Sequence, residues 1–378
     1  MQKVELKDAN RNDNFKLSKS EMKIFPTFKE FINDMLIIIT VILVLLGGLW
    51  FYMIRMPNVA FQGEPPPLNP VERELFDNLK SHVAFLASDL RGRNQNDNNS
   101  LTPSKNYIID QFRAYGYQVS LQEYQAFVEM YSHLGAKLLA QYKNLDETYA
   151  NIEVELLGKD KPEEIIIVGA HYDSVAGSPG ANDNASGVAG VLEIARLLHE
   201  QKLSRTVRFV AFVNEEPPFF QTEAMGSFVY AKRSATKAEN IVGMIALETI
   251  GYFRDEPGSQ QYPPPFSFFY PDKGNFIGFV GNLWSRRLLR QAIDIFRKIS
   301  KIPSEGAAVP AFIPGVSWSD HGSFWKNDYP AIMITDTAPY RYPYYHTAQD
   351  TPDQIDYKKM TRVVMGVQKV VEVLANKL

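Results

Sequence analysis

Three runs of apolar residues in this sequence are each followed by side chains that can bind metal or transfer protons. These side chains are His171 and Asp173 after IIIVGA, Glu215 and Glu216 after VRFVAFVN, and Glu248 after IVGMIAL. Removing a charged side chain from water without a partner is costly, so their position at the ends of buried runs needs a physical reason. Imidazole and carboxylate groups gathered at one sheet edge are suited to divalent cations and to general acid–base catalysis.

Two more residues of these types lie in turns. Asp183 lies in GANDNASG (180–187), just before a helical pattern, and His346 lies in YPYYHTAQDTPD (342–353). The chain contains no cysteine, which excludes thiolate ligands and cysteine nucleophiles. A site built from histidine and carboxylate suits zinc, with manganese and cobalt as alternatives.

Each of these signals has a structural explanation when taken alone. A single histidine at a strand end is more often a hydrogen-bonded structural residue than a ligand, and paired glutamates are usually solvated on a helix face. Five such signals where strands end, at the edge where α/β sheets bind their ligands, favour a functional site.

The residues between these motifs alternate between strand and helix patterns. Apolar runs rich in β-branched residues are typical of strands buried on both faces. Their alternation with helices predicts an α/β fold, a three-layer αβα sandwich around a mostly parallel mixed sheet, preceded by one transmembrane helix. The expected strands are 118–124, 149–158, 164–170, 206–213, 240–248 and 331–335, and the expected helices are 71–88, 106–117, 186–201, 282–300 and 357–377.

Two long segments, 215–228 and 255–275, are rich in proline and aromatic residues. They are interpreted either as rigid surface loops or as pocket walls, since long ordered loops are usually functional. As pocket walls they indicate a preference for hydrophobic side chains, through Phe219, Phe220, Tyr262, Phe266, Phe268 and Phe269.

Five motifs resemble those of one enzyme family. They are HYD (171–173), GANDNASG (180–187), NEE (214–216), LETIG (247–251) and YYHTAQDTPD (344–353). In order and spacing they are similar to the two-zinc (co-catalytic) aminopeptidases, a family that includes secreted bacterial leucyl aminopeptidases and glutamate carboxypeptidase. The segments 79–93 and 317–325 extend the resemblance, which covers the chain from about residue 70 to its C-terminus.

The resemblance implies two Zn²⁺ per chain. Asp183 would bridge the ions, His171 and Glu248 would complete one site, and Glu216 and His346 would complete the other. Position 248 is most often aspartate in the family, so the additional methylene of Glu248 bears on the occupancy and metal preference of its site.

The resemblance also implies a zinc-dependent metallo-aminopeptidase that acts on peptides. Glu215 would be the general base, Asp173 would orient His171, and Tyr345 would donate a hydrogen bond to the oxyanion. Residue specificity and oligomeric state stay open, as does aminopeptidase against carboxypeptidase or dipeptidase action.

Two alternatives use the same fold. A glutaminyl cyclase is a transferase with one zinc, and a non-catalytic ectodomain of the transferrin-receptor type is a binding module. The first would need an empty second site, and the second would have lost ligands. The presence of both His171 and a carboxylate at position 248 argues against them.

An uncharged apolar run, residues 35–54, matches the length of a membrane-spanning helix. We expect a signal anchor preceded by a cytoplasmic tail (1–34) and followed by a Pro-rich spacer (55–70) and a zinc-dependent peptidase domain (71–378). More lysines precede the run than follow it, which places the peptidase domain outside the cytoplasm. The net charge of −3 gives no indication of nucleic-acid binding.

Other histidines and aspartates are expected to be structural. Asp320 and His321 would form hydrogen bonds around the pocket floor, and Asp350 and Asp353 would cap the turn into the last helix. His82, His133 and His199 have no carboxylate cluster near them in the sequence.

Overall fold

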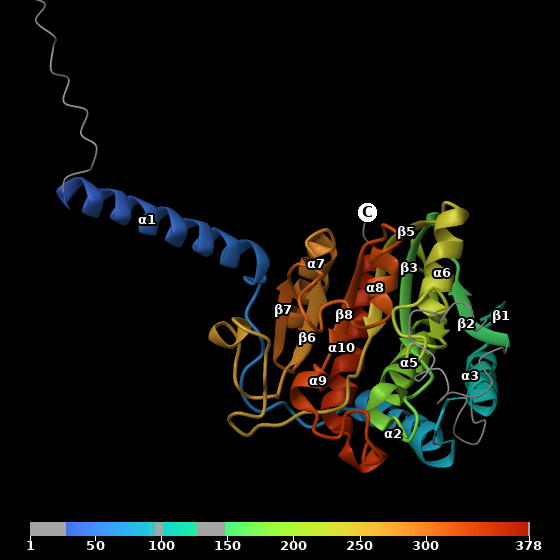
Figure 1. The fold of residues 1–378 in the computed structure, drawn as a ribbon. Coiled ribbons are helices and arrows are strands. Elements are labelled where there is room, and N and C mark those ends of the chain that lie inside the picture. Colours follow the sequence, from blue (N-terminus) through green and yellow to red (C-terminus); the bar gives the residue numbers. More distant parts are fainter. Residues whose placement is uncertain (1–27, 91, 95–100, 127–147, 377–378) are drawn as a thin grey trace, which may run out of the picture. The chain divides into compact units, whose positions relative to one another are not determined.

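The structure of the protein, a computed structural model, describes residues 28–90, 92–94, 101–126 and 148–376 (Figure 1). Residues 1–27 of the predicted tail, and His133, lie outside this part. The chain divides into two compact units, Met1–Trp50 and Phe51–Leu378. Helix α1, Phe28–Met53, supplies the described residues of the first unit, and by length and composition it could cross a membrane.

The second unit is built on one eight-stranded sheet with the order β1-β2-β4-β3-β5-β8-β6-β7. Strands β4, β3, β5 and β8 are parallel neighbours, as are β6 and β7, whereas β1–β2, β2–β4 and β6–β8 are antiparallel. The strands are β1 Val119–Gln125, β2 Thr148–Leu156, β3 Lys161–His171, β4 Arg205–Phe212, β5 Asn240–Leu247, β6 Ile277–Gly281, β7 Ser304–Ala308 and β8 Ala331–Thr335.

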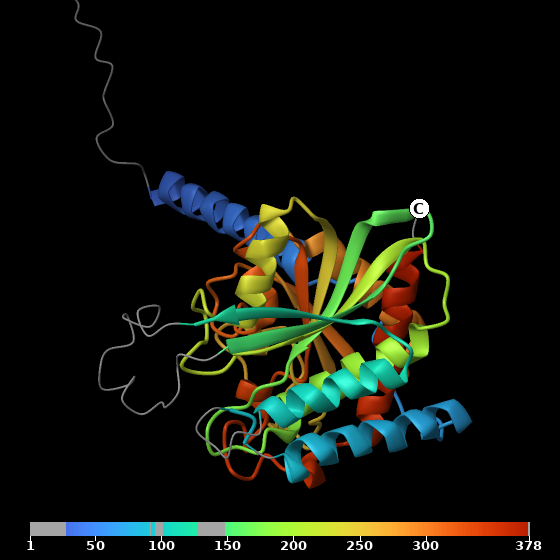
Figure 2. The same ribbon diagram turned by 90° about the vertical axis from the view of Figure 1, so that its right-hand side faces the viewer.

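Helices cover both faces of this sheet (Figures 1 and 2). On one face pack α2 Pro70–Ala84, α3 Leu101–Ala114, α5 Gly187–Leu198, α7 Arg286–Ile299 and α10 Tyr357–Ala375. On the other face pack α6 Gly226–Thr236 and α8 Asp320–Trp325, and the short α9 Ala338–Arg341 follows β8.

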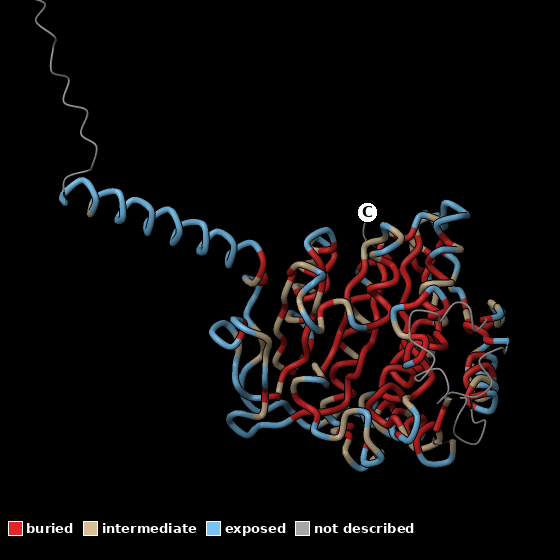
Figure 3. Tube along the Cα trace, viewed as in Figure 1, coloured by how far each residue is buried: buried red, intermediate tan, exposed pale blue. Residues whose placement is uncertain are grey.

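The core explains why the central strands read as unbroken apolar runs. In β3, Ile166 and Val168 belong to the core on the α5 side, while Ile165 and Ile167 belong to the core on the α6 side. Both sets are buried, as Figure 3 shows for the centre of the sheet. The predicted three-layer α/β architecture is therefore confirmed.

Every predicted strand and helix is present, with ends shifted by a few residues, but five of the elements named above were not predicted: β6, β7, α6, α8 and the four-residue α9. Strands β6 (IGFVG) and β7 (SEGAA) have five residues each and contain glycine, so they lack a clear strand pattern. Helices α6 and α8 are short, and α6 begins inside a segment that the sequence identified only as a loop.

The Pro-rich segment after the predicted span is hydrogen-bonded to the domain at two places. Arg297 Nη1 donates to the carbonyl oxygens of Pro57 (3.0 Å) and Asn58 (2.9 Å), and Arg362 donates to that of Pro66. An extended Pro-rich backbone leaves its carbonyl groups without internal partners, so arginine side chains of the domain can bind it.

Candidate metal centre

The predicted site residues meet at one edge of the sheet. His171 is the last residue of β3, Glu248 directly follows β5, and Glu215 and Glu216 follow β4 after a two-residue turn. Because β3 is parallel to both β4 and β5, the carboxyl ends of the three strands lie together.

A turn before α5 brings Asp183 into the centre of this group. The carboxylate offers one oxygen to each side: Oδ1 lies 3.3 Å from His171 Nε2, and Oδ2 lies 3.1 Å from His346 Nε2. Glu248 Oε2 is 3.3 Å from His171 Nε2, and Glu216 Oε2 is 3.3 Å from His346 Nε2.

The result is two overlapping triads with Asp183 in common. His171, Asp183 and Glu248 form one, and Asp183, Glu216 and His346 form the other; within each triad the ligand atoms lie within 4.8 Å of one another. These are the five residues that the sequence singled out as metal ligands.

Glu215 belongs to neither triad. Its Oε2 lies 3.9 Å from His171 Nε2, so its carboxylate faces the centre without completing either ligand set. Burial raises the pKa of Glu215 well above its usual value; Glu248 and Glu216 raise it further, whereas His171 opposes the rise.

Asp173 holds both the imidazole and the glutamates. Its Oδ1 lies 3.5 Å from His171 Nδ1, as expected for an orienting partner. Its two oxygens also accept from the backbone N–H groups of Glu215 (3.1 Å) and Glu216 (3.0 Å). One carboxylate therefore positions side chains from two strands, which is more than the sequence predicted.

Several supporting residues were missed. Ser319 Oγ donates to Glu248 Oε2 at 2.8 Å, and Asn184 Nδ2 lies 3.3 Å from the same oxygen. The buried guanidinium of Arg93 donates to the carbonyl oxygens of Tyr172 and Gly180, and so joins the turns that carry His171 and Asp183.

The predicted capping role of Asp350 is wrong. Its oxygens accept from the backbone N–H groups of Asn182 (2.8 Å) and Asp183 (3.1 Å), and Tyr342 donates to it. The residue that caps α10 is Asp356, through the N–H of Lys359. The motif YYHTAQDTPD thus contains both a member of one triad, His346, and the carboxylate that fixes the turn of Asp183.

Electrostatics in this centre favour a bound cation. Burial and the nearby Asp183 raise the pKa of Glu216 to about 7, against the effect of His346. Burial also raises the pKa of Glu248, again opposed by a histidine, His171. Carboxylates crowded in a buried site resist ionisation unless positive charge compensates them.

The ligand atoms that would bind such a cation are not engaged in hydrogen bonds. His171 Nε2, both Asp183 oxygens and Glu216 Oε1 are buried and have no hydrogen-bond partner of ordinary geometry. Buried polar atoms are rarely left unpaired, and histidine nitrogen with carboxylate oxygen is a donor set that zinc prefers. The residues therefore fit zinc.

Tyr345 stacks on His346 with ring centroids 3.9 Å apart. Burial and the carboxylates of Asp183 and Glu216 raise its pKa well above the usual value, so its hydroxyl stays protonated. The residue also lines an apolar cavity.

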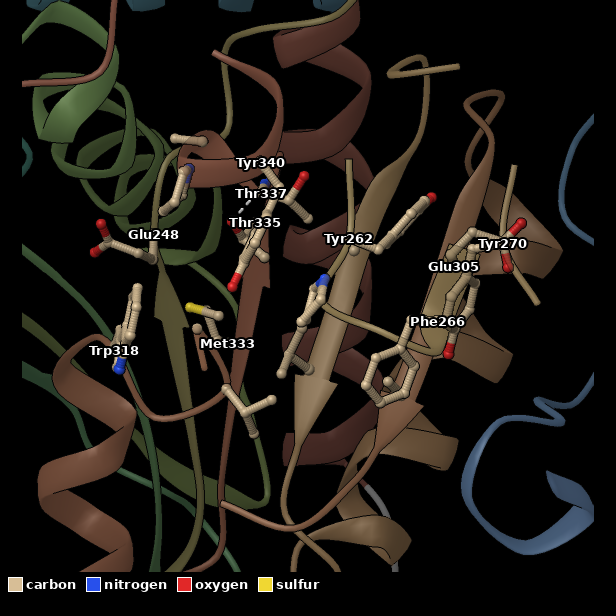
Figure 4. A pocket seen from close by; sticks show the side chains of 18 of the residues that line it. Glu248, Tyr262, Phe266, Tyr270, Glu305, Trp318, Met333, Thr335, Thr337 and Tyr340 are labelled. Atoms are coloured by element: carbon tan, nitrogen blue, oxygen red, sulfur yellow. Dashed lines mark hydrogen bonds between the residues drawn. The ribbon is translucent and has the colours of Figure 1, made fainter. Parts of the chain in front are cut away.

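This cavity, of about 130 Å³, extends from Glu248 across β8 and β6 to Glu305 on β7 (Figure 4). Tyr262 and Phe266 from the aromatic loop line it, as predicted. The other aromatic residues named from the sequence do not: Phe268 is 85% exposed, and Phe219 is buried elsewhere beside Tyr149.

The remaining histidines do not join the centre. His82 lies 3.3 Å from Glu193, and His321 Nε2 bonds to the carbonyl oxygen of Val316 at 2.7 Å. Asp320 is fully buried, and burial raises its pKa to about 7. Within the described part of the chain its carboxylate oxygens have no hydrogen-bond partner of ordinary geometry, in contrast to the hydrogen bonds expected from the sequence.

Residues 151–371 match the sequence profile of "Peptidase family M28". The chain is 39% identical over 300 residues to the uncharacterized protein YfbL of Escherichia coli, which covers 77% of this chain and 86% of that protein. It is 26% identical over 245 residues to a probable leucine aminopeptidase 1 of Trichophyton verrucosum, covering 61% of this chain and 58% of that protein.

Solved structures share the fold at low sequence identity. BSAP, a zinc aminopeptidase from Bacillus subtilis, superposes with a TM-score of 0.59 at 16% identity, over 80% of this chain and 95% of that chain. A glutaminyl cyclase from Bacteroides thetaiotaomicron superposes with a TM-score of 0.55 at 18% identity, over 82% and 99%.

The profile match covers more than half of the chain and includes all five members of the two triads. It confirms the resemblance that the sequence motifs predicted. The chain therefore belongs to peptidase family M28.

Proposed function

We propose that this protein is a membrane-anchored, zinc-dependent aminopeptidase that binds two zinc ions per chain and removes N-terminal residues from peptides outside the cytoplasm. The zinc-dependent metallo-aminopeptidase class agrees with its family and with relatives named aminopeptidases and zinc metalloproteases. The observation that carries the proposal is the pair of triads that share Asp183, with Glu215 free beside them.

Zinc bound by His171, Asp183 and Glu248, and by Asp183, Glu216 and His346, would acidify a water molecule and polarise the scissile carbonyl. Glu215 takes the proton of the attacking water and returns it to the leaving amine. Its carboxylate lies beside both triads without belonging to either, so it can accept and return a proton there.

Tyr345 completes the proposed chemistry. Its hydroxyl, kept protonated by the surrounding carboxylates, donates to the oxygen on which negative charge develops. Asp173 orients His171 and, through the two backbone N–H groups, holds the base and its neighbouring ligand in position.

The cavity beside Glu248 and Tyr345 is the proposed pocket for the substrate's N-terminal side chain. Its wall is formed by apolar and aromatic groups such as Phe266, Val280 and Met333. Hydrophobic and aromatic side chains would fill this space and exclude water from the centre.

We assign the chain four parts: a cytoplasmic tail (1–34), a membrane-spanning anchor (35–54), a linker (55–70) and the peptidase domain (71–378). The support for the anchor is the length and apolar composition of α1 and the excess of lysine before it.

The test combines metal analysis with hydrolysis of amino-acid anilides by the full chain. We expect two zinc ions per chain and activity that a chelator removes. Glu215→Gln should lower kcat by roughly 10²–10⁴-fold, the usual contribution of a general base, with both metals retained.

Glu223→Gln, an exposed position in the loop that follows Glu216, is the matched control and should leave kcat unchanged. Full activity of Glu215→Gln would refute the assigned base. One zinc per chain with cyclisation of N-terminal glutamine would indicate a glutaminyl cyclase, and absence of both metal and activity would indicate a binding module.

A further inference from the structure

A second concentration of charge lies far from the metal ligands in the sequence. The basic surface consists of Arg55, Arg286, Arg287 and Arg290, together with Trp284, whose side chain is 92% exposed. Trp284 and three of these arginines line an open depression at the start of α7. Among the residues that the structure describes, no carboxylate lies within 4.0 Å of the four guanidinium groups.

These arginines repel one another. Burial lowers the pKa of Arg290, and the charges of Arg286 and Arg55 lower it further, whereas the charge of Asp294 opposes the shift. Asp294 is the sole acid within α7; it lines the same depression and is also bound by Asn58 (2.7 Å) and Lys298 (2.7 Å). One carboxylate beside the four arginines offsets their positive charge only in part.

Helix α7 adds further positive charge to the basic surface. The N-terminal end of a helix carries partial positive charge and favours acidic side chains. Helix α7 begins instead with Arg286 and Arg287, has no acidic residue in its first turn, and has no side-chain cap at Ser285. An external anion would relieve the repulsion.

Two arginines of the basic surface contact the segment in which the chain leaves the predicted span. Within the unit Phe51–Leu378, Arg286 Nε donates to the carbonyl oxygen of Tyr52 at 2.5 Å, and its guanidinium lies 4.0 Å from the centre of that ring. Arg290 donates to the carbonyl oxygen of Arg55, also at 2.5 Å. Met53 is buried against the same unit.

We propose that the basic surface binds the anionic phospholipid head groups of the membrane in which the chain is anchored, and so holds the peptidase domain with this face against the bilayer. The inference rests on the proposed anchor, because residues 51–54 then lie at head-group level. Arginine supplies charge for phosphate, and an exposed tryptophan is favoured at the membrane interface.

The test uses the full chain in lipid nanodiscs of phosphatidylcholine, with or without a third of the lipid replaced by phosphatidylglycerol. The sequence has no cysteine, so Leu283→Cys carries one fluorophore beside Trp284. Ser120→Cys on β1, roughly 34 Å from β7 at the usual strand spacing, is the control position. A spin label on the lipid head group serves as the quencher.

We expect stronger quenching at position 283 than at position 120, and only in the anionic discs. Arg287→Gln should lower the ratio of docked to free domain roughly fivefold, the value of one arginine at an anionic surface. Lys298→Gln, which removes an exposed charge at the other end of α7, should leave it unchanged. Unaltered anilide hydrolysis shows that each variant is folded.

Equal quenching at both positions, or quenching at position 283 that does not depend on phosphatidylglycerol, would overturn the inference alone. A chain that does not remain in the discs would remove the anchor proposal, and the inference with it. Neither result would affect the proposed peptidase activity, which is measured separately on a soluble anilide.

Discussion

At the scale of single residues, the centre depends on one carboxylate, Asp183, that belongs to both triads. Asp183 offers one oxygen to the triad of His171 and the other to the triad of His346. Asp350 accepts a hydrogen bond from the backbone N–H of Asp183 and so fixes the turn. The direction of the Asp183 carboxylate is therefore set by the backbone as well as by the side-chain rotamer. Such supporting contacts usually determine how tightly a metal is held.

Ser319 allows a direct test of this dependence. Its hydroxyl donates to Glu248 Oε2 at 2.8 Å, so Ser319→Ala should free that carboxylate to rotate. We expect roughly 10–100-fold weaker zinc binding at the site of Glu248, the usual cost of losing such a partner, with the other site unaffected.

Zinc titration of the full chain measures both affinities. Ser317→Ala, a serine two residues away and on the same loop, is the control. An unchanged affinity in Ser319→Ala would mean that the hydrogen bond does not orient Glu248.

At the scale of elements, the short strands β6 and β7 extend the sheet and create the floor of the cavity. Gly278 in β6 pairs with Thr335 in β8 and with Glu305 in β7. Because glycine has no side chain, the floor is open at this point. A Cβ there would lie 3.2 Å from Thr335 O, so even a small side chain would begin to fill the space.

We therefore expect Gly278→Val to shorten the pocket. The substitution should lower kcat/KM for both a phenylalanine anilide and an alanine anilide. The loss for the phenylalanine anilide should be at least roughly tenfold larger, in line with the effect of small steric changes in hydrophobic pockets. The measurement is the ratio of the two kcat/KM values.

Gly278→Ala should show a smaller change in the same direction. Equal losses for both substrates would indicate a damaged fold rather than a shortened pocket, and an unchanged ratio would show that the cavity does not receive the N-terminal side chain.

At the scale of the whole molecule, the buried carboxylates connect metal binding to stability. Glu215, Glu216 and Glu248 all have pKa values raised by burial, so the apo-protein must keep repelling groups close together. A ligand that binds only the folded state stabilises it by mass action.

Removing zinc with a chelator should accordingly lower the Tm of the full chain by about 10 °C. This estimate assumes a zinc concentration roughly a thousandfold above the Kd and the usual Tm shift for a domain of about 300 residues. Differential scanning fluorimetry before and after chelation measures the shift. Restoring zinc should reverse it, whereas magnesium should not.

His346→Ala lacks one ligand of the second triad and should show a smaller shift on chelation. A Tm that does not respond to chelation in the unmodified chain would contradict a buried, tightly held metal pair.

The sequence by itself predicted the fold class and, through the family resemblance, the five residues that meet in the two triads. Strands buried on both faces need continuous apolar runs, and charged residues directly after such runs must lie at the sheet edge. Since β3 is parallel to β4 and β5, this local pattern was enough to bring His171, Glu216 and Glu248 together.

Only the tertiary structure revealed the supports and surfaces. Asp350 lies 168 residues from the backbone group that it holds, and the floor of the cavity needs the glycine-containing strands β6 and β7, which have no clear pattern. Periodicity reports which face of an element is buried, but a contact between distant loops leaves no periodic signal. For that reason the candidate ligands could be predicted from the sequence, while the residues that orient them required the fold.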